Sequence, residues 1–339
     1  MSQAILETFA LGSQWRTLDP FLFCVHHRDA YPAGNAQLGP RASLAGRDIG
    51  QDFAGKDGWN MYHGEAVPGF PAHPHRGFET VTIVQRGFID HADSVGAFAR
   101  YGMGDVQWLT AGHGVVHSEM FPLLEPDRPN PLELFQIWLN LAPSDKRAPA
   151  DFAMFWRERI PVRTLVDGAG TKTIVTVIAG RFDDVVPLPP PAASWAARAD
   201  SDVAIWIVEL DAHASFTLPT ADADTNRALY FFEGTSVRVA GRTFDAPGGI
   251  VVRPDLRVDI AGGNDRARLL LLQGKPIGAP VVQHGPFVMN SAAEMHDTFA
   301  DYQRTGFGGW PWPSRAPVQP RERERFARHA DGRVEQAGD

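Results

Sequence analysis

Short apolar runs separated by turn-forming residues dominate the hydrophobic pattern of this chain. From residue 70 to 141 the runs are of strand length, rich in β-branched and aromatic residues, and bounded by Gly, Pro, Asn or Asp. This pattern is typical of β-strands joined by tight turns. The runs in this region are ETVTIVQ, FIDHAD, DVQWLT, GVVHSEM and ELFQIWLNL. A second series from 202 to 274, including DVAIWIVELD, RALYFFEG and ARLLLLQG, has the same character. The pattern predicts an all-β protein of two β-barrel modules.

The length of the chain predicts more than one domain, because 339 residues exceed the size that a single hydrophobic core usually reaches. The segment PLPPPAAS at 187–194 cannot sustain a strand ladder, so we place a linker near it. We expect an N-terminal domain at 1–186, a C-terminal domain at 187–316 and a charged tail at 317–339. The tail is poor in apolar residues, which predicts disorder or loose packing.

One short α-helix is expected after residue 291. Ser291 and Glu294 have the spacing of a capping box ahead of MHDTFADYQ, and Gly306 provides a stop signal. By contrast, the polar, Gly-rich segment 29–64 has no clean period. We expect it to be a loop that covers part of the molecule, with a lid as one interpretation.

Composition excludes several classes of protein. The formal net charge of −8 argues against direct nucleic-acid binding, which needs clustered basic residues. No apolar stretch is long enough to span a membrane, and the first residues do not resemble a secretion signal. The single cysteine, Cys24, fits a reducing compartment and is expected to be a small buried residue. We therefore expect a cytoplasmic protein without a membrane partner.

Two local motifs carry candidate chemistry: HPH at 73–75 and HSE at 117–119. Residues two apart in a strand point to the same face, so each motif presents two potential ligands in one direction. If the two strands are neighbours, His73, His75, His117 and Glu119 converge. Imidazole and carboxylate together suit iron, manganese, copper, nickel or zinc, and four ligands leave two positions open on an octahedral ion.

This argument does not decide which glutamate supplies the carboxylate ligand. Glu79 has the same strand parity as the HPH histidines, so it could replace or join Glu119. The other histidines have no partner on the same face, and we expect ordinary hydrogen bonds for them. They are His26, His27, His63, His91, His213, His284, His296 and His329.

Longer motifs give the chain a resemblance to a known family. The run GFPAHPHRGFETVTIVQRGFIDHADSVG, followed by GDVQWLTAGHGVVHSEMF and NPLELFQIWLNL, resembles the pirin family of the cupin superfamily. GPFVMNS at 285–291 resembles the C-terminal signature of that family. The resemblance implies a bicupin, two β-barrel (jelly-roll) domains with a short C-terminal helix.

The resemblance also implies the ligand set. One divalent transition metal, most often Fe(II), would be bound by His73, His75, His117 and Glu119. Glu79 would either contact these ligands without binding the ion or be structural. The second module has no histidines in RALYFFEG or GGIVVRPDLRVDI, so we expect one metal per chain. His113 departs from the family pattern. It is interpreted as a residue of the surface or the rim of the site that forms hydrogen bonds, with a role as proton donor as the alternative.

Two functions fit this family. Some bacterial pirins open flavonols such as quercetin with dioxygen, and here Glu119 would act as the catalytic base. Phe78, Trp108 and Trp138 are candidates for an apolar pocket, although plain core packing is the simpler interpretation for each. The alternative is a regulatory protein that senses redox state or metal and acts by binding a protein partner. We expect a monomer, and both functions require the same four ligands.

Overall fold

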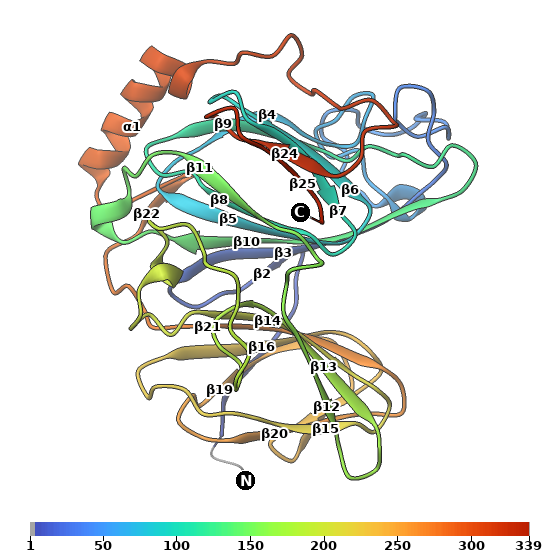
Figure 1. Cartoon of the computed structure of the whole chain (residues 1–339), viewed down its shortest axis with the longest axis vertical. Helices are drawn as coiled ribbons and strands as arrows, with labels where there is room; N and C mark the ends of the chain where they lie inside the picture. Colours follow the sequence, from blue (N-terminus) through green and yellow to red (C-terminus); the bar gives the residue numbers. More distant parts are fainter. Residues whose placement is uncertain (1–3, 339) are drawn as a thin grey trace. The chain divides into compact units, whose positions relative to one another are not determined.

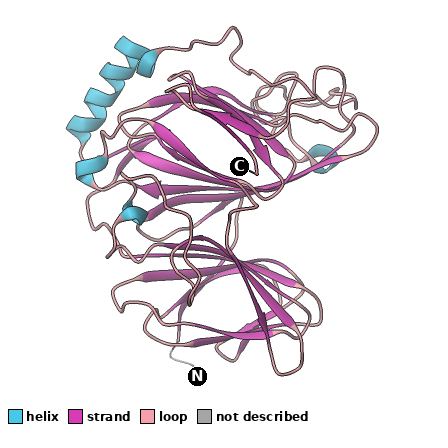
Figure 2. Cartoon of the chain, in the orientation of Figure 1, coloured by secondary structure: helices cyan, strands magenta, loops and turns pink. Residues whose placement is uncertain are grey.

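The computed structural model describes residues 4–338. Strands make up most of its regular structure, and α1 (Ala292–Thr305) is the principal helix (Figures 1 and 2). The all-β prediction is therefore confirmed. Four short 3-10 turns accompany these elements: η1 (Lys56–Gly58), η2 (Pro143–Asp145), η3 (Trp195–Ala197) and η4 (Gly306–Gly308). No helix among the described residues is long and apolar enough to cross a membrane.

The described chain forms two compact units, and each takes its residues from two separate stretches. One unit, the His-cluster unit, combines His26–Glu158 with the segment that begins at Ala279. The other unit combines the N-terminal segment up to Val25 with Arg159–Gly278. Each compact unit is thus built from two stretches that alternate along the sequence. The domain limits expected from the sequence, 1–186, 187–316 and 317–339, stay predictions.

The His-cluster unit contains two large sheets and the two-stranded sheet of β22 (Val282–His284) and β23 (Phe287–Met289). Strand order is β11-β8-β5-β10-β3 in the first sheet and β25-β24-β7-β6-β9-β4 in the second. Apolar side chains from both sheets, such as Leu109, Leu134 and Val115, form one buried core. The strands of the first sheet are β3 (Phe21–Tyr31), β5 (Phe78–Arg86), β8 (Val106–Thr110), β10 (Asn130–Asn140) and β11 (Asp151–Phe155). Those of the second are β4 (Gly69–His75), β6 (Phe88–Asp93), β7 (Phe98–Gly102), β9 (Val115–Met120), β24 (Phe326–Arg328) and β25 (Val334–Gln336).

The other unit repeats this two-sheet arrangement. Its larger sheet has the order β1-β19-β16-β21-β14-β13-β12 and its smaller sheet β15-β20-β17-β18. Both contribute to a second apolar core. The strands of the larger sheet are β1 (Ile5–Ala10), β12 (Val162–Val166), β13 (Lys172–Ala179), β14 (Ala204–Leu210), β16 (Asn226–Glu233), β19 (Gly248–Val252) and β21 (Ala267–Gly274). The smaller sheet has β15 (Ser215–Leu218), β17 (Val237–Val239), β18 (Arg242–Phe244) and β20 (Val258–Gly262), and β2 (Gln14–Trp15) pairs with the start of β3.

Helix α1 begins and ends where the sequence predicts. The Ser291 hydroxyl accepts a hydrogen bond from the Glu294 backbone N–H at 3.2 Å, and Gly306 adopts the left-handed conformation at the end. The helix packs on the hairpin of β22 and β23, where the rings of Phe287 and Phe299 lie 5.5 Å apart.

The C-terminal tail is ordered against the second sheet, so the expected loose packing is wrong. β24 pairs with β7, and Phe326 is buried. The buried Arg100 side chain donates to both oxygens of Asp90, each at 2.7 Å, and to the backbone oxygens of Pro320 and Arg323 at 2.7 and 3.0 Å. The charged tail is therefore held by the specific hydrogen bonds of Arg100 together with the burial of Phe326 and Ala327, which its overall composition did not indicate.

Candidate metal site

The pairing of β4 with β9 brings the two histidine motifs together. These strands are antiparallel neighbours, and His73 lies opposite His117 in the register (Figure 1). Residues directly opposite in such a pair point to the same face. The convergence predicted from strand parity is therefore found for His73, His75 and His117.

The three histidines form a compact cluster. One potential ligand nitrogen from each lies within 4.8 Å of the others. The ring centroids are 4.5 Å apart for His73 and His117, and 4.8 Å apart for His75 and His117. His73 Nδ1 lies 2.9 Å from the backbone oxygen of Pro71. That contact assigns the ring proton to Nδ1 and leaves Nε2 free to bind an ion.

Several nitrogens of the cluster have no hydrogen-bond partner among the described residues. These are both ring nitrogens of the fully buried His117 and Nδ1 of His75. A buried polar atom without a partner is costly, and a metal ion bound to the ring nitrogens would remove much of that cost. The donor set thus fits a divalent transition metal.

Burial also keeps the cluster in the protonation state that metal ligands need. It lowers the pKa of His73 to about 4 and holds the pKa values of His75 and His117 well below their ordinary range. The three imidazoles are therefore neutral near pH 7, as coordination requires.

Glu119 lies beside the cluster, and its carboxylate accepts hydrogen bonds from residues that are not part of the cluster. Its Oε2 lies 3.9 Å from His117 Nε2 and accepts a hydrogen bond from Gln136 Nε2 at 2.7 Å. Thr82 Oγ1 donates to the other oxygen at 3.3 Å. Two ligands bound at about 2.1 Å to one ion are at most about 4.2 Å apart, so Glu119 and His117 can share an ion. Burial raises the pKa of Glu119.

Glu79 is not on the strand that carries HPH. The turn at Arg76 and Gly77 ends β4, and Glu79 belongs to β5, so the parity argument does not apply to it. Its carboxylate accepts a hydrogen bond from Thr110 Oγ1 at 2.7 Å. Glu79 thus has a hydrogen-bond partner on β8, which fits a structural role.

Sequence reasoning missed a fourth histidine near the cluster. His91 on β6 is buried, its ring centroid lies 5.4 Å from that of His117, and its Nε2 lies 3.1 Å from Asp93 Oδ2. No local motif could have found it, because His91 comes near the cluster through the pairing of β6 with β9, which places it opposite Glu119. His113, by contrast, is exposed, and its Nδ1 lies 3.1 Å from the Ala148 backbone oxygen, as expected of a surface residue that forms a hydrogen bond.

A cavity of about 710 Å³ opens at His73. One wall comes from the segment predicted to be a covering loop, through Gly50 and His63, and the facing wall comes from Ser314 and Arg315 of the C-terminal segment. Ala72 donates a backbone hydrogen bond to the Arg315 oxygen at 2.7 Å. Arg315 therefore contributes a cation to the cavity at His73, a feature that no local motif signalled.

The aromatic candidates separate into two groups. Phe78 and Trp138 flank His75, with ring centroids 5.1 and 5.4 Å from its imidazole and 4.2 Å from each other. Trp108 is fully buried and packs at 6.0 Å against Phe155 instead. Phe78 and Trp138 thus give the cluster an apolar side, whereas the contact of Trp108 is one of core packing.

Two units of face-to-face sheets, with a cluster of metal-ligand type in one of them, define a bicupin. The family is given by sequence: the family model described as Pirin matches residues 6–139, and the one described as Pirin C-terminal cupin domain matches residues 205–308. The chain belongs to the pirin family.

Curated relatives agree with this assignment, and a solved structure has a similar fold. A "Pirin-like protein" of Caulobacter vibrioides is 39% identical over 70% of this chain and 80% of its own length. A Pseudomonas aeruginosa protein named "Putative quercetin 2,3-dioxygenase" is 37% identical over 70% of this chain and 79% of its own. In fold, the chain is similar to a crystal structure of quercetin 2,3-dioxygenase from Acinetobacter baumannii, with a TM-score of 0.70 and 24% identity over 90% of this chain and 98% of that one.

Proposed function

We propose that this protein is a metal-dependent dioxygenase of pirin type that opens flavonols such as quercetin. The observation that carries the proposal is the buried cluster of His73, His75 and His117, whose unpartnered ring nitrogens suit a bound ion. The names of the relatives support the substrate class, because several are named for action on quercetin.

The proposed ligand set is His73, His75, His117 and Glu119 around one divalent ion. Three imidazoles and a carboxylate suit Fe(II) first, with manganese, copper, nickel or zinc as alternatives. When bound, such an ion lowers the pKa of a substrate hydroxyl and supplies the redox chemistry for reaction with dioxygen.

Glu119 would then have two tasks, as ligand and as proton acceptor. The hydrogen bonds from Gln136 and Thr82 hold its carboxylate beside His117. Because burial raises its pKa, its carboxylate form is a stronger base than that of an exposed glutamate. The proton of the flavonol hydroxyl passes to Glu119, and the electron-rich substrate anion then reacts with dioxygen, with ring opening and release of carbon monoxide.

The walls around the cluster suit a flat, polar aromatic substrate. Phe78 and Trp138 provide an apolar surface beside His75. Arg315 lines the cavity at His73, where one N–H of its guanidinium donates to the Ala72 backbone oxygen. The other N–H groups of the guanidinium suit an oxygen atom of the substrate.

Metal analysis combined with a turnover assay tests this proposal. The purified protein is loaded with Fe(II) without oxygen, and quercetin absorbance and carbon monoxide are followed after air is admitted. Metal-dependent loss of quercetin with one equivalent of carbon monoxide is expected, and a His117→Ala variant should show neither. Loaded wild-type protein with no turnover above that control would contradict the enzymatic assignment.

A further inference from the structure

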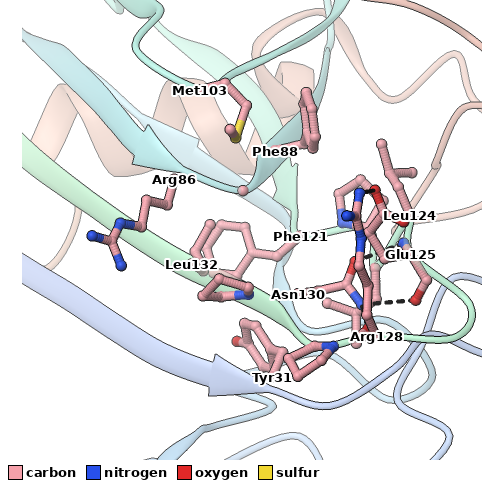
Figure 3. A pocket seen from close by; sticks show the side chains of 15 residues that line it. Tyr31, Arg86, Phe88, Met103, Phe121, Leu124, Glu125, Arg128, Asn130 and Leu132 are labelled. Atoms are coloured by element: carbon pink, nitrogen blue, oxygen red, sulfur yellow. Dashed lines mark hydrogen bonds and ion pairs between the residues drawn. The ribbon is translucent and has the colours of Figure 1, made fainter.

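A second cavity, of about 550 Å³, lies elsewhere in the His-cluster unit and shares no lining residue with the cavity at His73. We call it the Met103 pocket. Figure 3 shows Phe121 and Leu132 at its centre, Met103 and Phe88 on one side, and Tyr31 on the other. Its volume and mainly apolar lining are typical of small-molecule sites.

The walls of the Met103 pocket are fixed before any ligand arrives. Pro122, Pro129 and Pro131 form part of the lining and restrict the backbone there. The Asn130 side chain closes the loop between β9 and β10: its Nδ2 donates to the Glu125 backbone oxygen at 2.9 Å, and its Oδ1 accepts from the Glu125 N–H at 2.7 Å. A preformed pocket loses little entropy when a ligand binds.

Two features that are usually unfavourable for stability, an exposed apolar side chain and a left-handed backbone conformation, occur together at the rim of the Met103 pocket. Met103 is 43% exposed and has a φ of 56°, a left-handed conformation that is unusual for a residue with a side chain. Gly87 faces it with a φ of 77°, and a Cβ atom there would lie 2.8 Å from Leu132 Cδ1. An exposed apolar side chain on strained backbone indicates a contact surface rather than a stabilising element.

The charged residues of the pocket lining are Arg86, Arg128 and Glu125, so the lining itself carries one net positive charge. Arg128 and Glu125 pair at 2.6 Å and neutralise each other. The ion pair of Arg86 with Glu133, which is not part of the lining, is long at 3.9 Å from Nε, and the Arg86 side chain is 59% exposed. Its flexible charged end can therefore meet an anionic group of a ligand whose apolar body lies on Phe121 and Leu132.

We propose that the Met103 pocket binds a small amphipathic organic anion, with a flat or aliphatic body and one acidic group at Arg86. This site is independent of the metal site and of the dioxygenase function proposed above.

A matched pair of fluorescent probes tests the proposal. 1-Anilinonaphthalene-8-sulfonate has an apolar body and one negative charge, and N-phenyl-1-naphthylamine is its uncharged counterpart. Both should bind the native protein at one site. Arg86→Gln should lower the affinity for the anionic probe by about fivefold and leave the affinity for the neutral probe unchanged. Leu124→Trp, which fills the pocket from its half-buried wall, should abolish both.

Controls separate this site from the rest of the surface. Arg41→Gln removes an exposed arginine outside the lining and should change neither probe. Removal of metal from wild-type protein should also leave probe binding unchanged. Equal affinity of the sulfonate for wild type and Arg86→Gln would overturn the charge assignment. Probe binding that survives in folded Leu124→Trp, or that disappears with the metal, would overturn the site.

Discussion

His73 on β4 lies opposite His117 on β9, and their ring centroids are 4.5 Å apart. Because this pair is fixed by backbone register, the two imidazoles are held in position by the sheet itself rather than by a flexible loop. The lack of a hydrogen-bond partner at either nitrogen of His117, within the described chain, leaves the ring ready to coordinate an ion.

The choice between two buried glutamates can be tested by a matched pair of substitutions. Glu119→Gln keeps the shape of the side chain but removes the proposed ligand and base, so turnover should fall by at least about 100-fold. Glu79→Gln should retain the metal and most of the activity, because Glu79 contacts Thr110 on β8. Metal content and kcat of both variants are the measurements. Full activity in Glu119→Gln with loss of metal in Glu79→Gln would reverse the assignment.

Gln136 is predicted to position Glu119. Its Nε2 donates to Glu119 Oε2 at 2.7 Å, and its own oxygen accepts from Thr82 at 2.8 Å. Gln136→Leu should lower metal affinity or kcat by about 10- to 100-fold, the usual effect of losing a residue that orients a ligand. Gln136→Glu places a second carboxylate beside Glu119, and we expect the pH profile of kcat to move to higher pH. An unchanged pH profile in that variant would show that the two side chains do not act together.

We expect the buried ion pair of Arg100 and Asp90 to provide the main stabilising contacts of the C-terminal tail. Arg100→Leu leaves Asp90 buried without its partner, and breaking a buried pair in this way costs about 3–5 kcal/mol of unfolding free energy. Denaturant unfolding measures this loss. Arg304→Leu removes an exposed arginine that pairs with Asp301 and should cost under about 1 kcal/mol. Similar losses in both variants would contradict the proposed role of Arg100.

A weaker contact of the tail should make its docking sensitive to acid. Hydrogen bonding from Arg325 lowers the pKa of Glu158 from its ordinary value of 4.5 to about 2. The stabilisation is therefore complete above pH 4.5 and is lost as the pH falls from 4.5 towards 2. The effect is small because the pair is partly exposed. Hydrogen exchange at β24 should show less acid dependence in Glu158→Gln than in wild type, and equal acid dependence would exclude this contact as its cause.

The sequence predicted those parts of the site that depend on local periodicity. HPH and HSE are each within one strand, so the face shared by His73 and His75 could be inferred from residue spacing alone. The same argument failed for Glu79, because Gly77 lies in a turn between strands where a Cβ atom would be 2.0 Å from the Val288 oxygen. That close approach depends on a segment more than 200 residues away, which no periodicity can show.

The other site residues that the sequence did not predict depend on partners far away in the chain. Gln136 reaches Glu119 from the opposite sheet, and Arg315 reaches the cavity from the C-terminal segment. The tail has few apolar residues, so its composition predicts weak packing. Its order comes from the acceptors it offers to Arg100, from the pairing of β24 with β7 and from the burial of Phe326, and these partners could not be identified from the sequence.

The most direct test of the central claim is anomalous diffraction from crystals of the metal-loaded protein, measured at the absorption edge of the bound ion. We predict one peak in the His-cluster unit, about 2.1 Å from a ring nitrogen of each of His73, His75 and His117 and within reach of Glu119. A peak at any other place, or loaded crystals without a peak at this cluster, would contradict the account.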